Sequence, residues 1–349
     1  MRIAIIGMPL SGKTTLFDAV TGRRDEPGAY AAPGSLHIGV VPVPDERVEF
    51  LAGILQPKKA THATLEFVDI GGLFTGEKPN PDSVAAMRQA DALVKVVRAF
   101  ESHAVPHPKG SVDPKRDLDE IDGDLFVTDL DVIERRIETL HVSVRHPTPK
   151  QEEEKAELAL LERCRAQLDT VGALDRLDLK DEERKALRGY TFLTQKPAAV
   201  VVNVGEAQIG NEVALAPPVL ALCADMEKEL LALDPEERKP FMDDLGITEL
   251  SAQKVIAASL QALGLITFFT ANEKELRAWL LSRGSTAVEA AGKVHTDLAR
   301  GFIRAEVVAT ADLRQFGSLK EVKAHGRLRL EGKDYVVQDG DVLQIRFSV

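Results

Sequence analysis

A glycine-rich loop near the start of the chain constrains its fold more than any other feature. Residues 7–15 read Gly-Met-Pro-Leu-Ser-Gly-Lys-Thr-Thr and follow the apolar run 2–6, which predicts a buried strand that ends in the phosphate-binding pattern G-x-x-x-x-G-K-T. The glycines allow the backbone to curl so that its N–H groups face a phosphate. A helical pattern through Leu16, Phe17 and Val20 follows, and the positive end of that helix would point at the same anion. The sequence therefore predicts a nucleotide-binding site.

The side chains of this loop have distinct expected roles. We expect Lys13 to reach the β- and γ-phosphates and the Thr14 hydroxyl to ligate Mg²⁺. The residues expected to contact the nucleotide are Gly7, Pro9, Leu10, Ser11, Gly12, Lys13, Thr14 and Thr15.

A second candidate phosphate element is a D-x-x-G pattern at the end of the predicted strand 65–69. It begins at Asp69 and ends at Gly72. In P-loop switch proteins the Asp holds Mg²⁺, usually through water, and the Gly N–H meets the γ-phosphate. An ordinary turn at the end of a strand gives the same short pattern. The pattern therefore indicates a phosphate site only because a phosphate-binding loop precedes it in the chain. The predicted catalytic set is Lys13, Thr14, Asp69 and Gly72, and the predicted metal ligands are Thr14 and Asp69.

A third element follows the predicted strand 198–203, where the chain reads Asn203-Val204-Gly205-Glu206. Open α/β sheets bind ligands at such carboxyl ends of strands. Guanine-specific switch proteins have Asn-Lys-x-Asp here, and the Asp accepts two hydrogen bonds from guanine. Glu206 is one methylene longer, which disfavours GTP and permits ATP. The predicted base-contacting residues are Asn203, Val204, Glu206, Cys223 and Ala224; the alternative is an ordinary polar strand end.

Charge, cysteine content and hydropathy limit the classes of function. The net charge of −11 predicts no broad basic field, so any contact with nucleic acid would be local. Cys164 and Cys223 have no metal-ligand spacing, which suits a reducing cytoplasm. The first residues lack a signal-peptide pattern, and no apolar run approaches about 18 residues. We therefore expect a cytoplasmic protein with no membrane and no DNA partner.

The apolar pattern predicts a parallel sheet interrupted by a helical insert. Buried strands are expected at 2–6, 65–69, 92–97, 198–203 and 219–223. A coiled-coil stripe is predicted at Phe126, Leu130, Ile133, Ile137 and Leu140, and a second helical face at Leu158, Leu161, Cys164, Leu168 and Val171. Pro147 and Pro149 separate the two, which predicts an antiparallel hairpin. A small β-rich module follows, with strands expected at 305–308, 327–330, 334–337 and 342–347.

Together these motifs resemble the YchF (Obg-like ATPase) family. The resemblance is carried by G-x-P-x-x-G-K-T-T-L-F in the loop, residues 39–45, D-I-x-G-L at 69–73 and N-V-x-E at 203–206, while 300–306 and 331–335 resemble its TGS domain. It implies an α/β P-loop NTPase sheet with a helical-hairpin (coiled-coil) insert and a C-terminal β-grasp (TGS) domain. The implied boundaries are 1–125 with 197–264, then 126–196, then 265–349.

The resemblance also implies a function. The chain would bind ATP with Mg²⁺, hydrolyse it slowly, and act with the ribosome, through rRNA or ribosomal proteins, in translation or stress regulation. Leu73 stands where other switch proteins have a glutamine that positions water. Leu10-Ser11 replaces the family's Asn-Val, which puts potassium activation in doubt, and the first switch lacks its Thr, with Ser35 the nearby hydroxyl.

These departures leave alternative functions open. An adaptor that binds nucleotide with little or no turnover is favoured by the missing Thr. A GTP-binding protein is the alternative in specificity. A small P-loop kinase is a further class, but such kinases bring arginines in a lid and need neither the N-x-x-E pattern nor a TGS module.

Overall fold

The fold consists of two compact units. The computed structural model describes residues 1–23, 36–71, 80–211, 213, 215, 219–244, 247 and 249–348. Unit 1 comprises Met1–Gly39 and Glu66–Ser259, and unit 2 comprises Val40–Leu65 and Leu260–Val349. Residues 40–65 thus cluster with the C-terminal part, whereas the boundaries implied by the sequence placed them in the nucleotide-binding domain.

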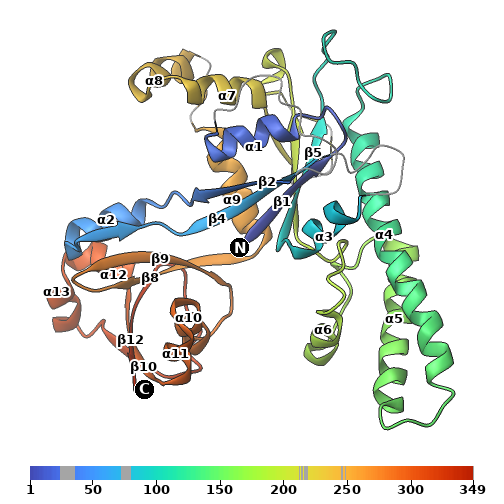
Figure 1. Ribbon diagram of the computed structural model, residues 1–349. Helices are drawn as coiled ribbons and strands as arrows, with labels where there is room; N and C mark the ends of the chain where they lie inside the picture. The colour runs from blue at the N-terminus through green and yellow to red at the C-terminus, as the bar shows by residue number, and fades with distance from the viewer. Residues whose placement is uncertain are drawn as a thin grey trace. The chain divides into compact units, whose positions relative to one another are not determined.

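Unit 1 is built around a sheet in which five neighbouring strands pair in parallel, as the sequence predicted. The strand order is β2-β4-β1-β5-β6-β7, and the bounds are β1 Arg2–Gly7, β2 Leu36–Pro42, β4 Thr64–Ile70, β5 Ala92–Arg98, β6 Ala198–Asn203 and β7 Val219–Leu222. β1 pairs in parallel with β4 and β5, and β6 with β5 and β7. The near-continuous apolar runs in β1 and β5 are buried because helices cover the sheet on both faces (Figure 1).

The helices of this unit lie on the sheet or extend from it (Figure 1). They are α1 Lys13–Thr21, α3 Pro81–Gln89, α4 Pro114–Ser143, α5 Gln151–Val171, α6 Asp181–Leu187, η1 Glu206–Gln208, α7 Ala224–Ala232, α8 Pro235–Asp244 and α9 Ser251–Ala262. None of the helices in these described stretches is long and apolar enough to cross a membrane.

The predicted hairpin consists of α4 and α5, whose apolar stripes form a core of their own. The stripe starting at Phe126 belongs to a longer helix, which begins at Pro114 because Asp113 caps it. The first turns of α4 pack Ile121 and Leu125 into the core of the sheet. One stripe residue differs from expectation: Val171 is 51% exposed because α5 ends there.

Unit 2 contains a second, mixed sheet of order β11-β10-β12-β8-β9-β3. The strands are β3 Lys59–Thr61, β8 Leu265–Ala271, β9 Glu275–Ser282, β10 Phe302–Ala309, β11 Arg329–Glu331 and β12 Asp341–Phe347; the helices are α2 Glu46–Leu55, α10 Ala287–Val294, α11 Thr296–Arg300, α12 Thr310–Phe316 and α13 Leu319–Ala324. α10 contributes buried alanines to the core beneath Phe268 and Leu343.

The strand predicted at 334–337 is wrong. Val336 forms only an isolated bridge with Thr286. The neighbouring backbone groups bond to the start of α10 instead, through Ala287 N–H to Tyr335 O and Val337 N–H to Ser285 O. These bonds satisfy the segment without a ladder, which the alternating pattern could not reveal.

Candidate nucleotide-binding site

The phosphate-binding loop joins β1 to α1, and two of its residues must be glycine for steric reasons. Gly12 has φ +90°, and a Cβ there would lie 2.1 Å from Asn203 Nδ2. A Cβ on Gly7 would lie 2.2 Å from the Val96 carbonyl oxygen. The loop therefore packs directly against the ends of β5 and β6, which only a bare backbone permits.

Lys13 supplies a buried cation at the first position of α1. Its Nζ donates to Met8 O at 2.8 Å, within the curve of the loop. Burial lowers the pKa of Lys13 to about 8, although the Asp69 carboxylate acts in the opposite direction. An ammonium held in this way at a helix N-terminus, among backbone N–H groups, suits a phosphate ligand.

Thr14 and Asp69, the two predicted metal ligands, lie together. Thr14 Oγ1 donates to Asp69 Oδ2 at 2.8 Å, because β4 runs beside β1 and places Asp69 opposite Ile5. Burial raises the pKa of Asp69, and the hydrogen bond from Thr14 opposes this rise.

Buried polar atoms with no partner mark the same place. Within the described residues, Asp69 Oδ1 and Ser11 Oγ are buried and form no hydrogen bond. A hydroxyl beside a carboxylate is the oxygen donor set that Mg²⁺ prefers, so Thr14 and Asp69 fit this ion. When bound, the ion would neutralise charge on the phosphates.

Asn203 connects the loop to the next turn of the sheet. It is 3% exposed, its Nδ2 donates to Ser11 O at 3.1 Å, and its Oδ1 accepts from Ala224 N–H at 3.0 Å. The predicted base-contacting residue thus holds the phosphate loop, which leaves one amide hydrogen for a base.

The other predicted base-contacting residues differ in exposure. Val204 is buried and its N–H bonds to Leu222 O, and Cys223 is also buried. Glu206 begins the short helix η1 and is exposed. The carboxylate is therefore free to face a ligand over this turn, whereas the valine acts through packing.

Several predicted residues lie outside the described part of the chain: Gly72, Leu73 and Ser35. In the first predicted switch only its end is described. His37 Nδ1 lies 3.8 Å from Asp69 Oδ2, and Gly39 packs so closely on α1 that a Cβ would meet Thr21 at 2.4 Å.

Sequence reasoning missed Arg98, the last residue of β5. Its side chain is 1% exposed, and it donates to Leu10 O, Phe100 O and Val105 O. The available signal was a cation that directly follows the predicted buried strand 92–97, because proteins in general rarely bury charged side chains.

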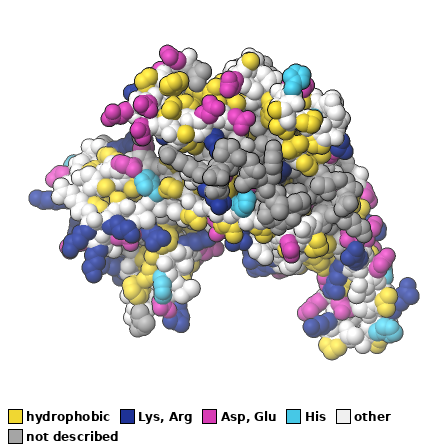
Figure 2. Space-filling model, turned by 45° about the horizontal axis from the view of Figure 1, so that its top comes forward, with side chains coloured by type: hydrophobic (Ala, Val, Ile, Leu, Met, Phe, Trp, Pro, Cys, Tyr) yellow, Lys and Arg dark blue, Asp and Glu magenta, His cyan; other side chains and the backbone are white. Residues whose placement is uncertain are grey.

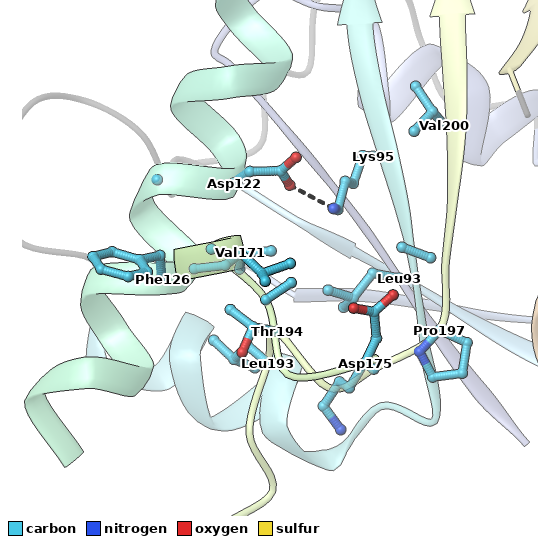
Figure 3. A pocket seen from close by; sticks show the side chains of 16 residues that line it. Leu93, Lys95, Asp122, Phe126, Val171, Asp175, Leu193, Thr194, Pro197 and Val200 are labelled. Carbon is cyan, nitrogen blue, oxygen red and sulfur yellow. Dashed lines mark hydrogen bonds and ion pairs between the residues drawn. The ribbon is translucent and has the colours of Figure 1, made fainter. Parts of the chain in front are cut away.

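A separate cavity of about 420 Å³ lies at the opposite ends of β5 and β6, beside α4 (Figure 3). Its cations already have partners: Lys95 pairs with Asp122, and Lys196 Nζ donates to Arg88 O and Ala90 O. The loop, Thr14 and Asp69 are absent from its lining, so we do not assign the nucleotide to it.

A parallel sheet with this loop after its first strand, a Thr–Asp pair and a strand-end Asn defines a P-loop nucleotide-binding protein. Relatives identify the family. The chain is 40% identical to the "Ribosome-binding ATPase YchF" of Haemophilus influenzae over 100% of this chain and 99% of that protein. It is 36% identical to the Bacillus subtilis protein of the same name over the full length of both.

A solved structure and a family model also match this chain. The "Schizosaccharomyces pombe YchF GTPase" superposes with a TM-score of 0.84 at 28% identity, covering 99% of this chain and 97% of that one. A family model named YchF-GTPase_C, described as a protein of unknown function (DUF933), matches residues 265–348. The chain belongs to the YchF family.

Proposed function

We propose that this chain is an ATP-binding P-loop switch protein that hydrolyses ATP slowly and acts with the ribosome. The observation that carries the proposal is the buried Lys13 beside the Thr14–Asp69 pair. The partner comes from the relatives, whose names describe ribosome-binding ATPases.

The preference for ATP rests on the turn after β6. Glu206 is exposed there, and its carboxylate is displaced by one methylene from the position that would accept two bonds from guanine. Adenine has no ring N–H to offer this carboxylate. The Schizosaccharomyces pombe relative is called a GTPase, so GTP binding is the competing outcome.

Slow turnover follows from what the site lacks by sequence. Leu73 has no group that can orient water, and within the described residues no arginine forms a hydrogen bond or ion pair with Lys13, Thr14 or Asp69. Switch proteins without such groups hydrolyse nucleotide slowly. A binding adaptor with no turnover is the limiting case of this proposal.

Unit 2 is the part of the chain best suited to RNA. Residues 265–348 carry 13 Lys and Arg against 11 Asp and Glu, whereas the whole chain has a net charge of −11. Figure 2 shows several Lys and Arg side chains over unit 2, and others over the α4–α5 hairpin. Arg304 and Arg346 are exposed cross-strand neighbours, and such local clusters can hold RNA phosphates.

Ribosome co-sedimentation tests the proposal. The protein is mixed with ribosomes at two salt concentrations, with ATP, with ADP or without nucleotide. We expect binding that weakens as salt rises and that differs between ATP and ADP. Lys13→Ala serves as the control in which the nucleotide no longer alters binding. Absence of co-sedimentation in every state at low salt would overturn the ribosomal part of the proposal and leave those arginines as solvated strand faces.

A further inference from the structure

Arg98 is a buried cation to which the nucleotide site described above assigns no role. Its guanidinium is enclosed among backbone carbonyls, and in the described part of the chain no carboxylate forms an ion pair with it. Burial lowers its pKa, and the charges of Glu101 and Asp117 only partly oppose this. Burying an arginine without an ion-pair partner costs stability, which favours a functional role for the contacts it makes.

The pairing of the strands places Arg98 beside the phosphate loop. β1 and β5 pair with Gly7 opposite Val96, and β5 and β6 pair with Arg98 opposite Asn203. Arg98 therefore stands at the same edge of the sheet as the loop and the predicted base-contacting turn. Its Nη1 donates to the Leu10 carbonyl at 3.4 Å.

This contact supports one orientation of a peptide in the loop. In a trans peptide the C=O and the following N–H point in opposite directions. With Leu10 O directed at Arg98, the Ser11 N–H faces the interior of the loop, where it bonds to Met8 O at 3.3 Å. Lys13 Nζ bonds to the same carbonyl, so both donors converge on one point.

The backbone at Leu10 would not hold this orientation unaided. Leu10 has φ +61°, a left-handed conformation that costs free energy for any residue with a Cβ. Arg98 in turn is fixed by Nε to Phe100 O at 2.9 Å, by Nη2 to Val105 O at 2.7 Å, and by the Phe100 ring, 4.2 Å from Cζ. The guanidinium is a rigid fork that spans the loop and residues 100–105.

We propose that Arg98 is a positioning residue of the phosphate-binding loop, which holds the Leu10–Ser11 peptide with its N–H on Met8 O and so maintains the curvature of the loop that receives the nucleotide phosphates. It touches the loop backbone and contacts no nucleotide itself. The inference rests on the proposed nucleotide binding. It predicts that loss of Arg98 weakens binding of the phosphates and leaves discrimination between bases unchanged.

Titration of fluorescent ADP and GDP analogues against full-length variants tests this. Arg98→Met retains bulk and removes the donors, and we expect both dissociation constants to rise at least ~10-fold in equal proportion. Arg98→Lys keeps the charge and one donor site, and we expect an intermediate loss. The control is Arg88→Met, because Arg88 is also a largely buried arginine that donates to backbone carbonyls, Tyr190 O and Thr191 O, away from the loop. Unlike Arg98, it also pairs with a carboxylate, that of Asp129.

The results distinguish a failure of the positioning role of Arg98 from a failure of the proposed nucleotide binding. Thermal unfolding of each variant shows whether a loss of affinity merely accompanies a loss of stability. Arg88→Met should lower the midpoint of thermal unfolding and leave the affinities for both analogues within about twofold of the natural protein. Unchanged affinity in Arg98→Met, or an equal loss in Arg88→Met, would overturn the positioning role. If Arg98→Met does not fold, unchanged affinity in Arg98→Lys would do the same. Failure of the natural protein to bind either analogue would overturn the proposed function as well.

Discussion

At the scale of single residues, Lys13 contributes more than any other side chain to the binding free energy of the proposed nucleotide site. It is buried and its ammonium has one backbone carbonyl as its hydrogen-bond acceptor. A phosphate would supply charge that this acceptor lacks. The glycines and Lys13 could be predicted from sequence because their roles depend on neighbours within the same short loop. The loop pattern indicates where the backbone must turn and which residue carries the positive charge.

Replacing this lysine should therefore abolish tight binding. We expect Lys13→Ala to weaken the affinity for ATP at least ~100-fold, which corresponds to about 2–3 kcal/mol for a lost charge-assisted hydrogen bond. Titration of a fluorescent ATP analogue measures it. Lys115→Ala, at a side chain 77% exposed on α4, is the control and should bind normally. Unchanged affinity in Lys13→Ala would contradict the assignment of the loop.

The lowered pKa of Lys13 predicts a pH dependence. In the ligand-free protein burial lowers the pKa of Lys13 to about 8, whereas a bound phosphate would favour the protonated lysine. The affinity for nucleotide should therefore fall as pH rises above about 8, by up to ~10-fold per pH unit. The ligand-free protein should gain stability between about pH 8 and 10.5 because the unfolded lysine, with its ordinary pKa of 10.5, holds more protons there. Lys13→Arg should abolish this dependence of affinity, and a flat pH profile in the natural protein would contradict it.

At the scale of elements, the hairpin was largely predictable, and its attachment to the sheet was not. The stripe of α4 and α5 is periodic and therefore visible in sequence. The extension of α4 back to Pro114 was missed because Ile121 and Leu125 pack into the core of the sheet. They therefore do not belong to the apolar stripe that forms the core of the hairpin. Arg98 was missed for a similar reason, since its partners at residues 10 and 105 are brought to it only by the fold.

The separate core of the hairpin predicts separable stability. Ile137 is 3% exposed within that core. We expect Ile137→Ala to lower the free energy of unfolding of the hairpin by about 2–4 kcal/mol through lost burial and a cavity. The affinity for ATP should stay within about twofold, because the core of the hairpin shares no residue with the nucleotide site. Denaturant unfolding and nucleotide titration measure the two effects, and a parallel loss of affinity would contradict their independence.

The loops after β1 and β4 predict slow chemistry. Leu73 offers no group to orient water, and Leu10 replaces the asparagine that the family resemblance associates with potassium. We expect turnover below about 0.1 s⁻¹, as in switch proteins without a supplied arginine. Exchange of sodium for potassium should alter it less than about twofold. Phosphate release measured in each salt provides the test, and turnover of several per second or a large potassium stimulation would count against it.

At the scale of the whole molecule, the order of motifs along the chain revealed a P-loop sheet, a helical insert and a C-terminal module. The sequence did not reveal that Val40–Leu65 cluster with the C-terminal residues. In unit 2, β3 pairs with β9 and Arg47 of α2 bonds to Asp339. These contacts join residues more than two hundred positions apart, and no local pattern records them.

The most direct test of the central claim is calorimetric titration of the natural protein with ATP and with GTP in the presence of Mg²⁺. We predict one site per chain and at least ~10-fold tighter binding of ATP, because Glu206 cannot pair with guanine as a shorter Asp would. The combined change Glu206→Asp and Val204→Lys should shift this ratio toward GTP. Binding of GTP as tight as that of ATP, or no binding of either, would contradict the account.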